Sequence, residues 1–74
     1  MYTNMSAEKQ MPLEEQIHNY LKPHAFGKTR DEIHKKFQGD YPANQIDECL
    51  ERMINNKWVL DAGKLKWQPK PGGD

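Results

Sequence analysis

The side chains best suited to catalysis or metal binding in this sequence are one cysteine and three histidines, Cys49, His18, His24 and His34. A reactive thiol needs an exposed, electropositive setting. Cys49 instead lies in an apolar stripe at helical spacing, and free cysteine is among the most buried residue types. The histidines lack the close spacing of zinc ligands, and we expect His18 and His34 to face solvent. The sequence therefore predicts no catalytic residue, metal site or cofactor.

No pattern of an enzyme is found elsewhere in the chain. There is no Ser/His/Asp grouping and no glycine-rich phosphate loop. A chain of 74 residues also leaves little room for a cleft that excludes water around a substrate. We therefore expect a protein that is not an enzyme, has no small-molecule substrate and acts by binding a macromolecule.

Charge is balanced in total but uneven along the chain. Lys and Arg number 11, and Asp and Glu also number 11, so the net charge is zero with neutral histidines. Proteins that bind the nucleic-acid backbone usually carry a clear positive excess. Basic residues are concentrated in residues 28–36 and 57–70, whereas three carboxylates, Asp47, Glu48 and Glu51, lie between these stretches. Any attraction to nucleic acid must therefore come from how the charges are distributed.

The single cysteine also bears on the compartment. One thiol cannot form an intramolecular disulfide framework, and an unpaired thiol in so small a chain fits a reducing compartment. The longest apolar runs have only a few residues, too few to cross a membrane. We expect an intracellular protein that is cytoplasmic, or nuclear in a eukaryote, without a membrane partner.

The spacing of apolar residues predicts the first two helices that position these side chains. The first begins at Pro12, because proline suits the first helical position, and it stops before Pro23. Its apolar face comprises Leu13, Ile17, Tyr20 and Leu21. In the second, Thr29 and Glu32 match a capping box, and Gly39 supplies a left-handed end. Between the helices, "HAFGK" is too short for a helix and leaves Phe26 available to pack.

A third helix and a hairpin complete the predicted domain. The helix runs from about Pro42 to Asn55, with Asn55 or Asn56 closing it in the left-handed region. After Lys57 the apolar period changes from helical to alternating, with Trp58 and Leu60 on one face. The turn "DAGK" and a second alternating run then indicate a β-hairpin. The apolar residues of its two strands include Leu65 and Trp67.

The pattern predicts one small α+β domain over residues 11–68, between disordered tails at 1–10 and 69–74. We expect one core to hold the helices against the hairpin. Its predicted members are Leu13, Ile17, Ile33, Phe37, Ile46, Leu50, Ile54, Trp58 and Leu65. Trp58 and Trp67 are also suited to anchoring a partner, but we expect Trp58 to be core.

The element order, the helix start "TRDEI" and the transition "LERMINNKWVLDAGKLKW" resemble the winged helix-turn-helix family over roughly residues 12–68. The resemblance implies a small winged-helix domain of three helices followed by a two-stranded wing. It also implies a DNA-binding regulator of transcription, or of a phage or plasmid. In this family the third helix commonly enters the major groove of double-stranded DNA and the wing follows the backbone.

Carried onto this sequence, the resemblance assigns two sets of DNA contacts. The candidate base contacts on the third helix are Asn44, Gln45, Glu48 and Arg52. The candidate phosphate contacts are Lys28, Arg30, Lys35, Lys36, Lys64 and Lys66. The sequence departs from the family pattern because three carboxylates on the third helix would repel phosphates. A contact made mainly by the wing lysines, with the third helix only grazing the groove, suits this charge layout.

Many members of this family serve instead as docking modules in protein assemblies. In that alternative Asp47, Glu48 and Glu51 meet a protein partner with a basic surface, and the chain binds no nucleic acid directly. The wing lysines then serve as ordinary solvated residues of an edge strand, where lysine discourages aggregation.

Overall fold

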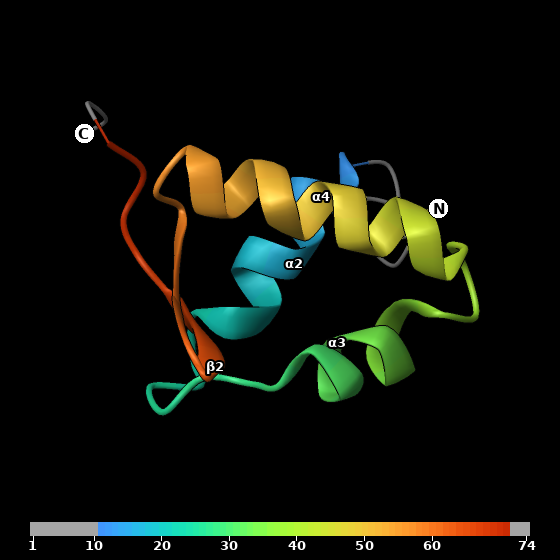
Figure 1. Cartoon of the computed structure of the whole chain (residues 1–74), viewed down its shortest axis with the longest axis horizontal. Coiled ribbons are helices and arrows are strands. Elements are labelled where there is room, and N and C mark those ends of the chain that lie inside the picture. Colours follow the sequence, from blue (N-terminus) through green and yellow to red (C-terminus); the bar gives the residue numbers. More distant parts are fainter. Residues whose placement is uncertain (1–10, 72–74) are drawn as a thin grey trace, which may run out of the picture.

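The computed structural model describes residues 11–71, which fold into three helices followed by an antiparallel two-stranded hairpin (Figure 1). The helices are α2 (Leu13–Leu21), α3 (Arg30–Phe37) and α4 (Ala43–Asn55), and the strands are β1 (Val59–Ala62) and β2 (Lys64–Trp67). This order confirms the predicted α+β layout. The predicted tail at 1–10, and residues 72–74 of the other tail, lie outside the described residues. In the described part, no helix has the length and apolarity to span a bilayer.

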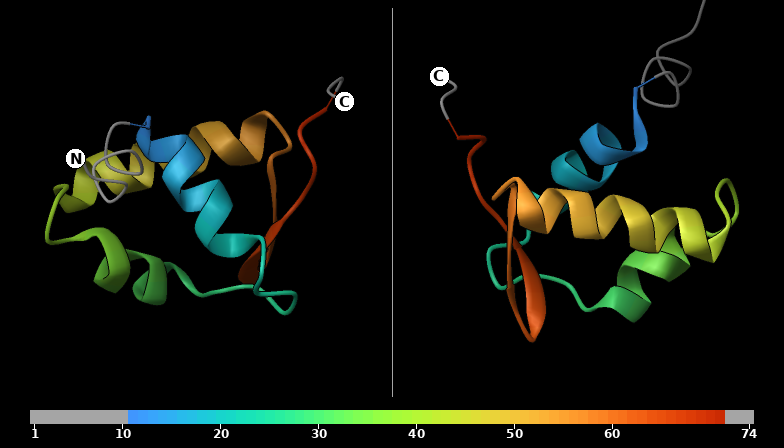
Figure 2. Two further views of the ribbon diagram at one scale, coloured as in Figure 1. Left: turned by 180° about the vertical axis from the view of Figure 1, so that it is seen from behind. Right: turned by 45° about the horizontal axis from the view of Figure 1, so that its top comes forward.

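The core lies where α2, α3 and the hairpin meet α4 (Figure 2). Most of the predicted core residues are buried, but Ile54 and Trp58 are only partly buried and pack against the core from its edge. Cys49 is fully buried, as predicted. The complete buried apolar set among the described residues is Leu13, Ile17, Leu21, Ile33, Phe37, Ile46, Cys49, Leu50, Met53, Val59 and Leu65.

The hairpin buries the opposite face of β1 from the one predicted. Val59 is buried at 3 % exposure, whereas Leu60 is 50 % exposed. The register pairs Val59 with Trp67 and Leu60 with Lys66, and cross-strand partners lie on the same face. The prediction failed because Trp58 was counted in phase with the strand, and a shift of one residue exchanges the two faces of a strand.

The helix ends confirm one capping prediction and correct two. Thr29 Oγ1 accepts the Glu32 N–H at 3.1 Å, and Glu32 Oε1 accepts the Thr29 N–H at 2.9 Å, which is the predicted capping box. Gly39 does not cap α3 in the left-handed region, because the helix ends through Gln38 at φ −64°.

At the end of α4 the left-handed residue is Lys57, at φ 68°, and neither asparagine. The Lys57 N–H donates to the Ile54 carbonyl at 3.1 Å, and the Trp58 N–H donates to the Met53 carbonyl at 2.8 Å. These two bonds form a Schellman motif, which usually has glycine at its left-handed position. The chain therefore turns from α4 into the hairpin through a strained lysine.

The loop before α3 pairs with the outer edge of β2 at one position. Lys28 and Leu65 exchange backbone hydrogen bonds of 3.1 and 2.8 Å, forming an isolated antiparallel bridge. Gly27 makes this approach possible at φ 85°, because a Cβ atom there would lie 2.9 Å from Lys66 Cγ and 3.0 Å from the Leu65 oxygen. The loop is thereby fixed against β2.

His18 is the clearest error in the predicted exposure. It is 5 % exposed and lies between two tryptophans, with its ring 5.1 Å from that of Trp67 and 5.5 Å from that of Trp58. Its Nε2–H donates to the Gln68 carbonyl at 2.7 Å. Lys70 binds Glu15 and stands over the Trp58 ring. Together these contacts hold the segment after β2 against α2.

Candidate nucleic-acid interface

The outer face of α4 carries the candidate base contacts. Asn44, Gln45 and Glu48 are exposed and make no hydrogen bond or ion pair through their side chains with another described residue. Amide side chains at the start of a recognition helix can read adenine in the major groove. Between them and the wing, however, the exposed residues of α4 are predominantly acidic.

Arg30, a candidate phosphate contact, is used inside the protein. Its Nη2 donates to Glu51 Oε2 at 2.8 Å, and its guanidinium lies 3.7 Å from Asp47 and 3.9 Å from Asp61. His34 Nε2 also lies 2.7 Å from Asp47 Oδ1. These contacts tie α3 to α4 and to β1. We call these five residues the α3–α4 junction.

Arg52, a candidate base contact, is also engaged. Its Nε and Nη2 donate to Glu14 Oε2 of α2 at 2.9 and 2.6 Å. Burial alone would raise the pKa of Glu14, but the hydrogen bonds and charge of Arg52 hold that pKa below its ordinary value. The hydrogen bond from Arg52 to Glu14 raises the arginine pKa in turn. The guanidinium of Arg52 is therefore already bound to a carboxylate near the start of α2.

The two lysines of α3 differ in their contacts. Lys36 Nζ stands over the Tyr20 ring, 5.6 Å from its centre. Lys35 is exposed and makes no ion pair within residues 11–71. Of these two lysines, only Lys35 has an ammonium group without an ion pair or ring contact in residues 11–71.

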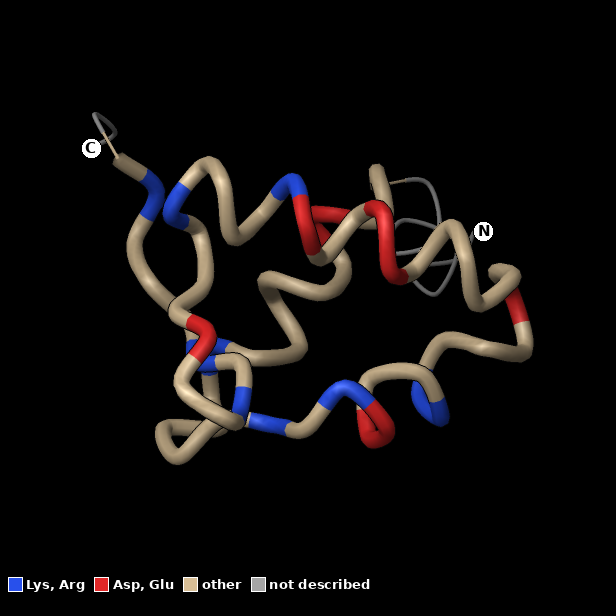
Figure 3. Tube along the Cα trace, in the orientation of Figure 1, with Lys and Arg blue, Asp and Glu red and all other residues tan. Residues whose placement is uncertain are grey.

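The remaining candidate phosphate contacts, Lys28, Lys64 and Lys66, gather on the wing (Figure 3). Lys64 and Lys66 lie on β2 opposite Ala62 and Leu60, and Lys28 bridges to Leu65 between them. None of the three makes an ion pair within the described residues. By this register Lys28 lies on the Leu65 side of the hairpin, and Lys64 and Lys66 lie on the other side with Leu60. We call the surface around the hairpin that these lysines form, with Phe26, Gly27 and Leu60, the wing face.

Two carboxylates, Glu32 and Asp61, adjoin the wing face. The pKa of Glu32 is lowered, first by the hydrogen bond from the Thr29 N–H and then by the charges of Lys28 and Lys64. Glu32 offsets part of the positive charge, but its carboxylate is already used by the capping box. Asp61 is next to Leu60 on β1 and lies 3.9 Å from Arg30. Three ammonium groups against these two carboxylates leave the wing face positive.

Two side chains on the wing face were not predicted as site residues. Phe26 is 83 % exposed and Leu60 is 50 % exposed. The sequence left Phe26 available to pack, and in the structure it stays exposed. The sequence did contain a signal, because Gly27 directly after Phe26 indicates a turn, and turns lie on the surface.

The other chemically capable groups lie inside the molecule. Burial raises the pKa of the Cys49 thiol to about 12, with a further contribution from the Glu14 carboxylate. Within residues 11–71, no three His, Cys, Asp or Glu side chains are grouped as metal ligands. Cys49 is therefore a core residue with an unreactive thiol.

In comparisons with known proteins, no protein-family model, no curated protein and no solved structure matches this chain. The argument for function therefore rests on the arrangement of the side chains described above.

Proposed function

We propose that this chain is a small DNA-binding domain of the winged-helix type whose contact is led by the wing. The observation that carries the proposal is the grouping of Lys28, Lys64 and Lys66 around the hairpin, without ion pairs to other described residues. Phosphates supply most of the affinity of such domains, and ammonium groups that are not already paired can meet them without breaking a contact.

α4 has a secondary role in this proposal. Arg30 and Arg52 are both paired, so α4 brings carboxylates without free guanidinium groups toward a groove. Contacts to base edges also need cationic neighbours to hold the duplex close. We therefore expect weak sequence preference, with Asn44 and Gln45 as its source.

The test is an NMR titration of the labelled protein with a short DNA duplex at low and at moderate salt. We expect amide shifts at residues 27–28 and 64–66 at low salt that fade as salt rises. Shifts absent from the wing at low salt would contradict the proposal. If α4 enters the groove, replacing Asn44 with Ala should reduce the difference in binding free energy between preferred and other DNA sequences by about 1–3 kcal/mol. If α4 stays outside the groove, this difference should not change.

Docking to a basic protein surface is the second candidate function, and one observation favours it. Asp61 from β1 joins Asp47 and Glu51 around Arg30, so three carboxylates surround one guanidinium group. Adjacent Glu48 adds a fourth carboxylate to this surface. This candidate predicts no shifts with the duplex at low salt. With oligolysine as the probe, it predicts shifts at Asp47, Glu48 and Glu51, which their amide variants remove.

A further inference from the structure

The wing face combines an exposed aromatic ring with cations, and phosphate binding alone does not account for the ring. Phe26 and Leu60 are the exposed large apolar side chains of the described residues. An isolated exposed leucine is common, whereas a phenylalanine that exposes 83 % of its surface needs an explanation. In an intact duplex the bases are stacked on one another, so none offers its flat face to such a ring.

Phe26 is held in place and does not belong to a freely moving loop. The Gly27 N–H donates to the His24 carbonyl at 2.9 Å, and Lys28 is bridged to Leu65 on the other side. The close approach of Gly27 to Lys66 and Leu65 fixes the backbone next to the ring. The backbone next to the ring is therefore held beside β2, which reduces the entropy lost by the loop on binding.

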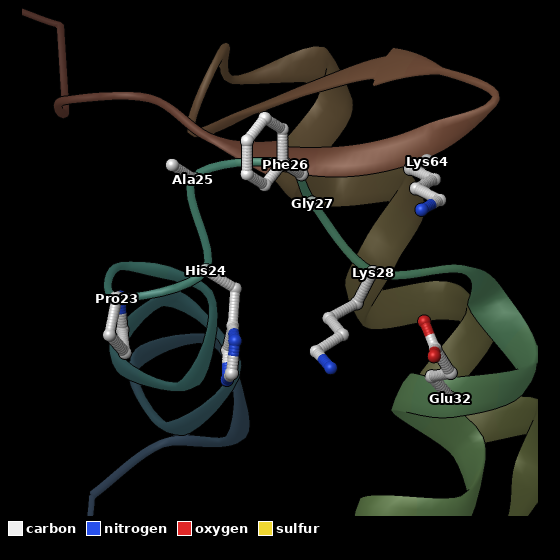
Figure 4. Close-up of a pocket in the computed structure, with 8 residues that line it drawn as sticks. All are labelled: Pro23, His24, Ala25, Phe26, Gly27, Lys28, Glu32 and Lys64. Atoms are coloured by element: carbon white, nitrogen blue, oxygen red, sulfur yellow. The ribbon is translucent and has the colours of Figure 1, made fainter.

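A shallow hollow of about 390 Å³ adjoins the ring. It is lined by residues 23–28 together with Glu32 and Lys64. Figure 4 shows Lys28 and His24 reaching into the space between α2 and α3, with Phe26 projecting at the side of β2. The hollow is within the size range of small-ligand sites. An aromatic surface thus stands next to a space bordered by two ammonium groups.

We infer that the wing face binds single-stranded nucleic acid, with a base stacked on Phe26 and the neighbouring phosphates held by Lys28, Lys64 and Lys66. Single-strand sites commonly combine a positive surface with aromatic side chains on which unpaired bases stack. The inference rests on the proposed function, because the same lysines hold the backbone. It adds that the bound nucleic acid is single-stranded, because only an unpaired and unstacked base exposes its flat face to Phe26.

The test compares an oligothymidylate of about 12 nucleotides with a blunt duplex of the same length, by fluorescence anisotropy at one low salt concentration. We expect Phe26→Ala to weaken binding of the single strand by about five- to a hundredfold, and binding of the duplex by less than about twofold. Phe26→Leu, which keeps an apolar side chain without a ring face, should lose nearly as much. Phe26→Trp should retain the affinity.

Two controls separate stacking from charge and from folding. Replacing Lys64 and Lys66 with Gln should weaken binding of both nucleic acids. Lys35→Gln, which removes a charge outside the wing face, should lower both affinities much less. Phe26 is so exposed that its variants should keep the thermal midpoint of the parent.

The outcomes distinguish the inference from the function on which it rests. Equal single-strand affinity in Phe26→Ala and the parent, while the lysine variant still loses affinity, would overturn the inference and leave the proposed function standing. Absence of binding to either nucleic acid by the parent at low salt would overturn both.

Discussion

The α3–α4 junction and the wing face both carry several charged side chains, but they use them differently. At the junction, Arg30 and His34 are paired with Asp47 and Glu51, and the result is a contact between helices. On the wing face, the lysines have no such partners within the described residues. The comparison shows that a charged residue is available to a ligand only where the fold has not already used it.

The energies of these contacts support the same distinction between paired and unpaired charges. An exposed ion pair contributes about 0.2–1 kcal/mol, so a phosphate could displace Glu51 from Arg30 at modest cost. The carboxylate would then remain beside the phosphate and repel it. A wing lysine has no ion pair with a described residue to give up, and the carboxylate near Lys28 and Lys64, Glu32, is bound by the capping box. The two regions should therefore respond in opposite ways to substitution, the junction in stability and the wing face in binding.

The largest expected effect comes from truncating a core side chain of α4, the helix against which both regions are built. Leu50 of α4 is fully buried in the core. Leu50→Ala should lower the free energy of unfolding by about 2–5 kcal/mol, which is much of the stability of so small a domain. Chemical denaturation measures it, with exposed Leu60→Ala as a control expected to stay within about 0.5 kcal/mol. A Leu50→Ala protein as stable as its parent would show that α4 is not the central element.

The next effect is confined to the wing face. Gly27→Ala places a Cβ atom 3.0 Å from the Leu65 oxygen at a positive φ, so the loop must shift away from β2. We expect a loss of about 1–3 kcal/mol in the free energy of unfolding. Gly39→Ala is the matched control, because a Cβ atom there meets nothing within 4 Å and φ is not positive. Equal thermal midpoints for both variants would contradict the described approach of the loop to β2.

A smaller effect belongs to the start of α3. Thr29→Ala removes the acceptor of the Glu32 N–H and should cost about 0.5–2 kcal/mol. The Glu32 pKa is lowered on folding from an ordinary value of 4.5. The contribution of that carboxylate is therefore present above pH 4.5 and is lost as the pH falls through the lowered pKa. Thr29→Ala keeps the backbone N–H that lowers this pKa, whereas Glu32→Gln removes the titrating group. Thermal melts across this range should therefore show the parent losing more stability than Glu32→Gln does.

The smallest stability effect is a gain, at the turn that leads from α4 into the wing. Lys57 occupies a left-handed position that suits glycine. Lys57→Gly should raise the free energy of unfolding by about 0.5–1 kcal/mol. Lys57→Ala, which removes the charge but keeps the strain, should give no such gain. A lower melting temperature for the glycine variant would mean that the lysine side chain stabilises the turn in another way.

The fold was largely predictable from the sequence because its signals are local. The capping box at Thr29 and Glu32, the apolar stripe of α4 and the glycine turn of the hairpin each depend on residues close in sequence. The buried face of β1 could not be predicted in this way, because it depends on how Val59 packs against core residues that are distant in sequence.

The candidate site was less predictable because it depends on long-range pairing. Arg30 meets Glu51 21 residues away, and Arg52 meets Glu14 38 residues away. Nothing in the spacing of either arginine distinguishes it from a free lysine of the wing. The burial of His18 has the same origin, because its carbonyl partner on Gln68 is 50 residues distant.

The salt dependence of duplex binding tests most directly whether the wing face, and not the junction, carries the contact. The slope of log affinity against log salt should fall by about two when Lys64 and Lys66 are both replaced by Gln, because about 0.9 counterions are released per phosphate contact. Arg30→Gln should leave the slope unchanged, because Arg30 is held by Glu51. A slope reduced by Arg30→Gln and unaffected by the two lysine replacements would contradict the account.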